Sequence, residues 1–149
     1  MSSIGNNRIL VIDDNKSLVF IAERVLQREG YIVSTALNGQ EGIHKAKTEK
    51  PDLIVLDIEM PGLNGYEVCR ELQQDQNTIN IPIIFLSAKG NTDETQGASA
   101  VGLKEIKLAF NLGASEFLHK PVSAADLITA VKKTLSFTDI ISSERATQG

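Results

Sequence analysis

Several residue types are scarce in this sequence, and each shortage excludes a class of protein. Cys69 is the only cysteine among 149 residues, so a disulfide framework and a cysteine-based zinc site are excluded. We expect its thiol to be buried on a helix. No run of about 18 apolar residues is present, so no membrane-spanning helix is expected. Residues 1–7 lack the charged and apolar regions of a secretory signal, and the expected location is therefore cytoplasmic.

Basic residues are too few for a general affinity for nucleic acids. The chain carries 15 Lys and Arg against 19 Asp and Glu, a formal net charge of −4. A protein that binds nucleic acid without regard to sequence needs clustered positive charge. We therefore expect no direct contact with nucleic acid. The length of 149 residues and the hydrophobic content of 42% are typical of one globular domain.

Short apolar runs recur along the chain, and polar residues follow each of them. The runs and their polar successors are Ile9–Ile12 before Asp13 and Asp14, Leu53–Leu56 before Asp57, Ile83–Leu86 before Ser87, and Phe117–Leu118 before His119 and Lys120. Each run is short and rich in branched residues, which indicates a buried strand. In an open parallel sheet, functional groups collect beyond the carboxyl ends of the strands. We therefore expect Asp13, Asp14, Asp57, Ser87 and Lys120 to meet at one edge, and we call them the strand-end cluster.

Segments with helical spacing separate the expected strands, which include Tyr31–Ala36 as the second. The first expected helix begins after a cap at Asn15 or Ser17, and its inward-facing residues are Leu18, Ile21, Ala22, Val25 and Leu26. The next three expected helices span Gly39–Lys47, Tyr66–Gln74 and Lys104–Leu112. The last expected helix is capped by Ser123, and its inner face carries Leu127, Ile128, Val131 and Leu135. Alternating strands and helices predict right-handed crossovers and a parallel sheet covered on both faces. We expect an N-terminal arm over 1–7, one domain over 8–137 and a polar C-terminal tail over 138–149, in which residues 142–149 are frayed.

The strand-end cluster predicts a site for a divalent cation and a phosphoryl group. Three carboxylates brought together repel one another unless a cation lies between them. Magnesium prefers such oxygen ligands, and manganese would also fit. Ser87 and Lys120 supply a hydroxyl and an ammonium for phosphoryl oxygens, and Asp57 is the candidate nucleophile because it ends the central strand. The Lys120-Pro121 bond is a candidate cis peptide.

These residues resemble the receiver domain of two-component response regulators. The segment Asp52–Gly65 is very similar to the phosphorylation-site signature of that family, and the resemblance covers about Arg8 to Leu135. It implies a flavodoxin-like (βα)5 fold, a doubly wound parallel sheet with strand order 2-1-3-4-5.

The resemblance also implies a role for each residue of the site. Asp57 would accept a phosphoryl group from a histidine kinase phosphohistidine or a phosphotransfer protein. Mg²⁺ would be bound by Asp14, Asp57 and the backbone carbonyl of Glu59, with Asp13 acting through a metal-bound water. Lys120 would pair with the phosphoryl oxygens, while Ser87 and Phe117 would form the switch. Glu59 and Lys89 occupy the two positions that tune self-dephosphorylation in the family.

The resemblance implies a signalling switch rather than an enzyme, with only self-phosphorylation and self-dephosphorylation chemistry. Its downstream protein target would contact the face formed by the fourth helix, the fifth strand and the fifth helix. This chain departs from the family pattern by an insertion at about residues 90–102, between the fourth strand and the fourth helix.

Other functions fit the sequence less well. An aspartyl-phosphate phosphatase or phosphotransferase usually carries an acid/base aspartate two residues after the nucleophile, where this chain has Glu59. An interaction module without phosphoryl chemistry would not need the intact strand-end cluster. A flavin-binding protein of the same fold would need a phosphate-binding loop after the first strand, where Asp13 and Asp14 would repel the phosphate.

Overall fold

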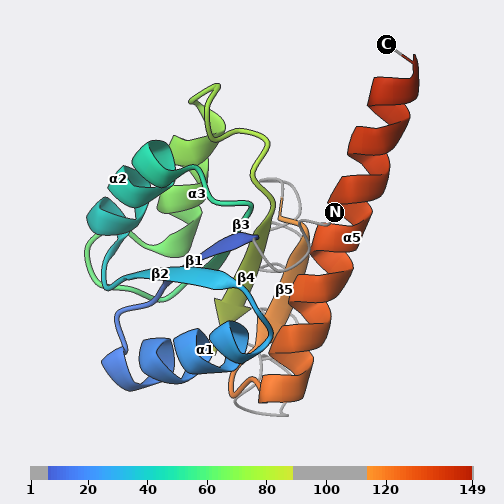
Figure 1. Ribbon diagram of the computed structural model, residues 1–149. Helices are drawn as coiled ribbons and strands as arrows, with labels where there is room; N and C mark the ends of the chain where they lie inside the picture. The colour runs from blue at the N-terminus through green and yellow to red at the C-terminus, as the bar shows by residue number, and fades with distance from the viewer. Residues whose placement is uncertain (1–6, 89–113, 149) are drawn as a thin grey trace, which may run out of the picture.

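The computed structural model describes residues 7–88 and 114–148 of the chain, and these form one α/β domain. The described elements are β1 (Arg8–Ile12), α1 (Lys16–Arg28), β2 (Ile32–Ala36), α2 (Gly39–Glu49), β3 (Leu53–Asp57), α3 (Gly65–Gln73), β4 (Ile83–Ser87), β5 (Glu116–His119) and α5 (Ala124–Gln148). The strands pair in parallel in the order β2-β1-β3-β4-β5, and Figure 1 shows α2 and α3 on one side of the sheet and α1 and α5 on the other. The expected doubly wound fold and strand order are confirmed.

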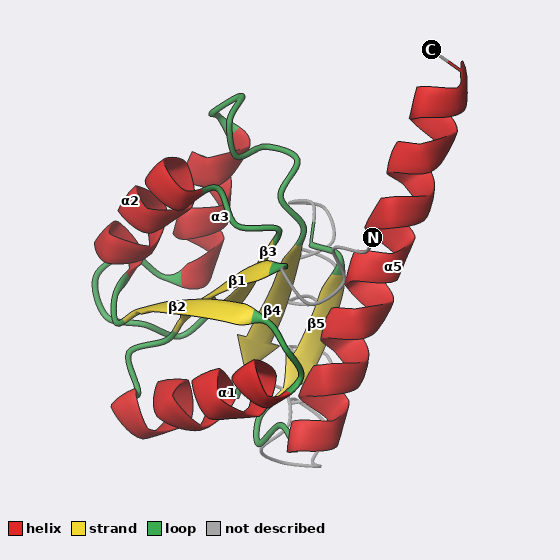
Figure 2. Cartoon of the chain, in the orientation of Figure 1, coloured by secondary structure: helices red, strands yellow, loops and turns green. Residues whose placement is uncertain are grey.

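The three central strands carry the core on both of their faces. Leu10, Ile54 and Phe85 pack toward α2 and α3, and Ile9 and Val55 pack toward α1 and α5. All five are fully buried, with no exposed surface. Successive side chains of a strand point to opposite faces of the sheet, so a strand that is covered on both faces has to be apolar throughout. These strands, drawn as yellow arrows in Figure 2, therefore appear in the sequence as continuous apolar runs.

Polar caps set the starts of the helices. The Asn15 side chain accepts a hydrogen bond from the backbone N–H of Leu18, at 3.1 Å, and the Ser123 hydroxyl accepts one from Asp126, at 3.0 Å. The expected caps at Asn15 and Ser123 are thus confirmed, and Ser17 lies within the first turn of α1. Each cap satisfies a backbone donor that the helix itself leaves without a partner.

Helix α1 buries a slightly different face from the one expected. Its buried residues are Val19, Ala22 and Leu26, while the side chain of Ile21 is 59% exposed. The expectation of an inward-facing Ile21 was therefore wrong. The three buried positions are three and four residues apart and define one stripe, from which Ile21 is displaced around the helix.

Helix α5 is longer than expected. It continues to Gln148, so residues 142–148 are helical, and the prediction from their polarity that they are frayed was wrong. No proline or glycine interrupts residues 124–148, and the helix can propagate beyond the sheet (Figure 1). The other expected helix and strand limits differ from the observed ones by one or two residues. The expected helix Lys104–Leu112 and the insertion at 90–102 lie outside the described residues.

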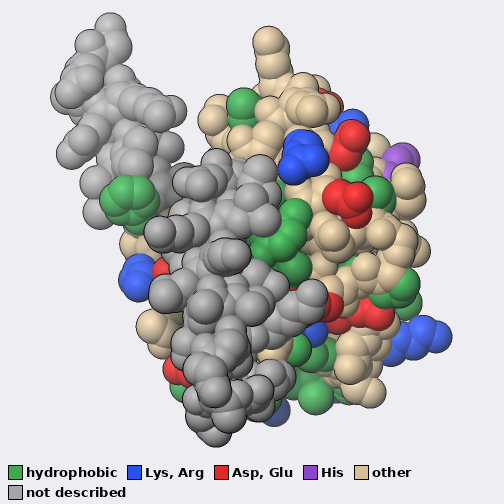
Figure 3. Space-filling model, turned by 180° about the vertical axis from the view of Figure 1, so that it is seen from behind, with side chains coloured by type: hydrophobic (Ala, Val, Ile, Leu, Met, Phe, Trp, Pro, Cys, Tyr) green, Lys and Arg blue, Asp and Glu red, His purple; other side chains and the backbone are tan. Residues whose placement is uncertain are grey.

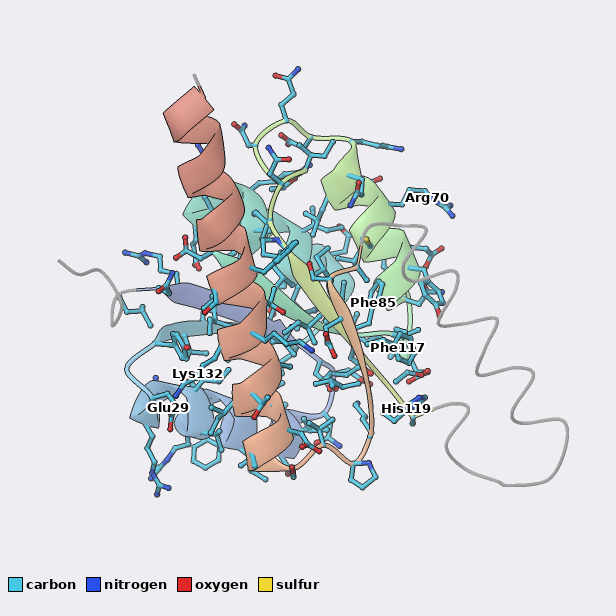
Figure 4. All side chains as sticks on the ribbon, turned by 90° about the vertical axis from the view of Figure 1, so that its right-hand side faces the viewer. Glu29, Arg70, Phe85, Phe117, His119 and Lys132 are labelled. Atoms are coloured by element: carbon cyan, nitrogen blue, oxygen red, sulfur yellow. The ribbon has the colours of Figure 1, made fainter. Side chains whose placement is uncertain are left out.

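The helices of one face are also tied to each other by charge. Lys132 on α5 and Glu29, which follows α1, point toward one another in Figure 4, with the ammonium 2.9 Å from the carboxylate. Because both side chains are exposed to solvent, water and salt screen this ion pair, and its contribution to stability is small. Among the described residues visible in Figure 3, acidic and basic side chains are interspersed, and Lys and Arg do not gather into one patch. No helix in the described ranges is both long and apolar enough to cross a bilayer.

Candidate functional site

The acidic residues of the strand-end cluster meet where β1 and β3 end side by side. Ile12 and Leu56 are register partners in the sheet, and Asp13 and Asp57 follow them. Asp13 is fully buried, Asp57 is 1% exposed, and Asp14 faces solvent. Carboxylate oxygens of the three residues lie within 4.8 Å of one another. The sheet therefore assembles the acidic cluster that the sequence predicted.

Lys120 lies between the two buried carboxylates. Its ammonium nitrogen is 2.9 Å from Asp13 Oδ2 and 3.0 Å from Asp57 Oδ1. The Lys120 backbone N–H donates to the carbonyl of Ser87, at 2.8 Å, and the Lys120-Pro121 bond is cis, as expected. Burial lowers the pKa of Lys120, but its hydrogen bonds to Asp13 and Asp57 outweigh burial and raise the pKa above its usual value. Lys120 is therefore a permanent cation at this site.

One ammonium does not balance the negative charge of the cluster. Burial, the charge of Asp13 and, to a smaller extent, the charge of Glu59 together raise the pKa of Asp57 to about 7, against the lowering effect of Lys120. A divalent cation would remove this repulsion. Because all side-chain donors are carboxylate oxygens and one of them is open to solvent, the site suits a hard ion that keeps several waters. The residues present thus fit a magnesium-type site.

Ser87 ends β4 next to this cluster, and its hydroxyl is engaged by a residue of the neighbouring loop. The fully buried Ser87 donates from Oγ to Glu59 Oε2, at 2.6 Å. The backbone N–H of Ala88 donates to the other oxygen of the same carboxylate, at 3.0 Å. The sequence did not predict this side-chain contact of Glu59 with Ser87 and Ala88. A signal was available, since Glu59 and Ser87 lie at the ends of adjacent strands.

The loop after Asp57 is held tightly against the strand ends. Ile58 N–H donates to the Leu86 carbonyl at 2.9 Å, and Gly65 N–H donates to the Ile58 carbonyl at 2.9 Å. Any Cβ at Gly65 would lie only 2.5 Å from the carbonyl oxygen of Asp57. Glycine is thus required where α3 begins, because α3 starts in direct contact with the backbone that carries Asp57.

Phe117 and His119 project from β5 beside the site (Figure 4). Their rings are in edge contact, with centroids 5.3 Å apart, and Phe117 packs partly buried against the α2–α3 core. The switch role of Phe117, like the individual roles of Ser87, Asp13, Asp14 and the Glu59 carbonyl, stays a prediction.

The fold and the strand-end cluster define a small doubly wound domain with a group of three carboxylates, which fits a cation, at the point where the strand order reverses. A profile of the response regulator receiver domain matches residues 9–132, which is most of the chain. The chain belongs to this family and is a receiver domain of two-component signalling.

Individual relatives agree with this assignment. The chain is 40% identical over 135 residues to the alkaline phosphatase synthesis transcriptional regulatory protein PhoP of Bacillus subtilis, covering 91% of this chain and 51% of PhoP. It is 34% identical to protein PilH of Pseudomonas aeruginosa, covering 87% of this chain and 98% of PilH. A response regulator receiver domain structure from Clostridium thermocellum superposes with a TM-score of 0.77 at 28% identity, covering 91% of this chain and 98% of that one. The chain spans about half of PhoP and 27% of the response regulator PleD of Caulobacter vibrioides.

Proposed function

We propose that this receiver domain is a phosphoaccepting switch in which Asp57 is the acceptor. The observation that carries the proposal is the buried Asp57 carboxylate held 3.0 Å from the Lys120 ammonium, with Asp13 on the other side of the same ammonium. A buried carboxylate with a raised pKa and a fixed cationic partner is typical of a reacting group. The phosphoryl donor would be a histidine kinase or a phosphotransfer protein, and the proposal places the domain in the cytoplasm.

In the proposed transfer, an Asp57 oxygen attacks the phosphorus of a phosphohistidine. The new O–P bond forms as the P–N bond breaks, and the electron pair of that bond stays on the imidazole nitrogen of the donor. Lys120 would neutralise charge on the phosphoryl oxygens, and Ser87 would donate its hydroxyl to one of them. In the separate dephosphorylation step, water attacks the phosphorus, the O–P bond to Asp57 breaks, and inorganic phosphate and the free Asp57 carboxylate are released. A Mg²⁺ or Mn²⁺ ion would be held by Asp14, Asp57 and the backbone carbonyl of Glu59, with Asp13 acting through a metal-bound water, and would neutralise charge that develops on the phosphoryl group.

The proposed chemistry is limited to uptake and loss of this phosphoryl group. A phosphatase acting on other substrates would need a free acid/base group near Asp57. The nearby Glu59 carboxylate instead accepts hydrogen bonds from Ser87 and Ala88. This contact supports a switch rather than an enzyme, with the downstream protein target contacting the face that includes β5 and α5.

The test is intact mass after incubation with acetyl phosphate and Mg²⁺. Wild type is expected to gain one phosphoryl group, and Asp57→Asn and an EDTA-treated sample are expected to gain none. The matched control is Asp52→Asn, which removes an exposed carboxylate just before the same strand and should be labelled like wild type. A label retained by Asp57→Asn would place the acceptor elsewhere. No label on a folded wild-type protein would contradict the proposed function.

A further inference from the structure

We propose that the Glu59 side chain is an internal competitor of the phosphoryl group, holding the two donors that a phosphorylated Asp57 would recruit. The inference rests on the proposed function and adds a residue that sets how readily the switch responds. Its basis is the two-point contact in which Glu59 Oε2 accepts from Ser87 Oγ at 2.6 Å and Glu59 Oε1 accepts from Ala88 N at 3.0 Å.

The two donors form a site for an anion with several oxygens. They come from adjacent residues at the end of β4, one from a side chain and one from the backbone, and they converge on the two oxygens of a single carboxylate. Hydrogen bonds to an ionised acceptor are shorter and about twice as strong as neutral ones. A phosphoryl group presents the same kind of acceptor, so it can use these donors only if the Glu59 carboxylate leaves them.

Glu59 is also close enough to Asp57 to respond to its charge. The β3 and β4 strands are paired at Asp57 and Leu86, which places Asp57 beside the strand end that carries Ser87. The negative charge of Glu59 already contributes to the raised pKa of Asp57. A phosphoryl group on Asp57 would add negative charge there and repel the Glu59 carboxylate. Glu59 is only partly buried, so its carboxylate can turn into water at low cost.

In this arrangement, phosphorylation of Asp57 changes the hydrogen-bond acceptor of Ser87 from the Glu59 carboxylate to the phosphoryl group. In the unphosphorylated protein Glu59 keeps the Ser87 hydroxyl and the Ala88 amide occupied. In the phosphorylated protein these donors would turn to the phosphoryl oxygens, and the loss of the Glu59 contacts would oppose part of the gain. Shortening Glu59 should therefore favour the activated state without touching Asp57, Lys120 or Ser87.

The test compares the affinity for beryllofluoride, a phosphoryl mimic, at saturating Mg²⁺ in wild type, Glu59→Ala and Glu59→Gln. We expect Glu59→Ala to bind about tenfold more tightly, because one charge-assisted contact is no longer lost on binding. Glu59→Gln should show a smaller gain, because its amide has only one acceptor oxygen for the two donors. The matched control is Glu71→Ala, which removes an exposed carboxylate from α3 and should bind like wild type.

A second readout examines the contact without any phosphoryl mimic. Ala88 is exposed, and Glu59 is the acceptor that its amide has in the structure. Hydrogen exchange of the Ala88 amide, followed by NMR without beryllofluoride, should accelerate in Glu59→Ala and stay unchanged in Glu71→Ala. In a Ser87→Ala background, the gain in affinity caused by Glu59→Ala should shrink, because one of the two donors is already gone.

The outcomes separate this inference from the proposed function. If wild type binds beryllofluoride and Glu59→Ala binds no more tightly, Glu59 does not compete and the inference is overturned. An equal gain in the Ser87→Ala background would also overturn it, since charge repulsion alone would then explain the effect. If neither wild type nor any variant binds beryllofluoride in the presence of Mg²⁺, the proposed function is contradicted, and the competitor role of Glu59 is contradicted as well.

Discussion

At the scale of single residues, the site carries more buried negative charge than folding alone would favour. Asp13 and Asp57 are almost completely buried and share one ammonium, that of Lys120. The pKa of Asp57, raised to about 7 by burial and by Asp13, means that its ionised form is disfavoured in the folded protein despite Lys120. The buried negative charge of these carboxylates thus lowers the stability of the folded protein, as is common at sites where proteins bind ligands.

This imbalance predicts that Asp57→Asn stabilises the metal-free protein. Asparagine has nearly the same shape without the charge, and Lys120 keeps Asp13 as its partner. At pH 8 without Mg²⁺ we expect the free energy of unfolding to rise by about 1–3 kcal/mol. Urea denaturation measures this, with the exposed Asp52→Asn as control. A loss of stability in Asp57→Asn would show that the ion pair with Lys120 outweighs the repulsion from Asp13.

The lone cysteine predicts a dependence of stability on alkaline pH. Burial raises the pKa of the Cys69 thiol from 9.0 to about 11, against a smaller lowering by a hydrogen bond with Gln73. Between these values the unfolded chain loses the thiol proton and the folded protein keeps it. Stability from this group is therefore complete below pH 9 and is lost as pH rises toward 11, by at most about 3 kcal/mol.

Urea denaturation at a series of pH values would measure this loss. Cys69→Ala is the comparison that cancels every other titrating group, and its stability should fall less steeply between pH 9 and pH 11. Parallel curves for the two proteins would contradict the prediction.

At the scale of elements, the junction between β3 and α3 determines how the site is built. The capping box of Asn64 and Glu67 starts α3 immediately after the loop that follows Asp57. The absence of a side chain at Gly65 lets that helix begin against the backbone of Asp57 and Ile58. The position of the acceptor aspartate is thus coupled to the position of a helix.

Two glycines of this junction should respond differently to alanine. A Cβ at Gly65 would meet backbone atoms at 2.5 and 2.7 Å, which cannot move without displacing Asp57. We expect Gly65→Ala to cost about 2–3 kcal/mol and to weaken beryllofluoride binding. Gly62 has a positive φ of 76° but open space around it, so Gly62→Ala should cost only about 1 kcal/mol and leave binding unchanged. Thermal denaturation and a beryllofluoride titration compare the two variants. Equal losses of stability and of affinity would contradict the claim that Gly65 is required because α3 begins in close contact with the backbone of Asp57.

At the scale of the whole molecule, the parallel sheet brings together groups that are far apart in sequence. Asp13, Asp57, Ser87 and Lys120 come from four strand ends, and the order β2-β1-β3-β4-β5 makes those ends neighbours. A cation bound by Asp14 and Asp57 would link the ends of β1 and β3 at the centre of the sheet. Its binding should therefore stabilise the domain as a unit rather than one loop of it.

We accordingly expect Mg²⁺ to raise the free energy of unfolding. Above the dissociation constant, each tenfold increase in Mg²⁺ should add about 1.4 kcal/mol for one bound ion. Denaturation at constant ionic strength measures this slope, with NaCl replacing MgCl₂ as the control. In Asp57→Asn, Mg²⁺ should raise the free energy of unfolding by less than in wild type. The difference in stability between this variant and wild type should therefore become smaller as Mg²⁺ is added. A wild-type stability independent of Mg²⁺ would argue against the cation site.

What the sequence determined by itself was the list of elements and the polar residues at their ends. Apolar runs of strand length, caps such as Asn15 and Ser123, and polar residues after each run depend on local spacing, which the chain displays directly. The convergence of Asp13, Asp57 and Lys120 followed from one general property of parallel sheets. These parts of the fold and of the site were predictable because neighbouring residues, or a rule common to all such sheets, decide them.

Only the tertiary structure decided how side chains meet across elements. The exposure of Ile21 depends on the angle at which α1 packs on the sheet, and the contact of Glu59 with Ser87 depends on the path of the loop after β3. The helical course of α5 beyond 137 opposes the local polarity from which fraying was predicted. The exposure of Ile21 and the contact of Glu59 are decided by orientation and long-range packing, whose energies are not written in any one segment of the chain.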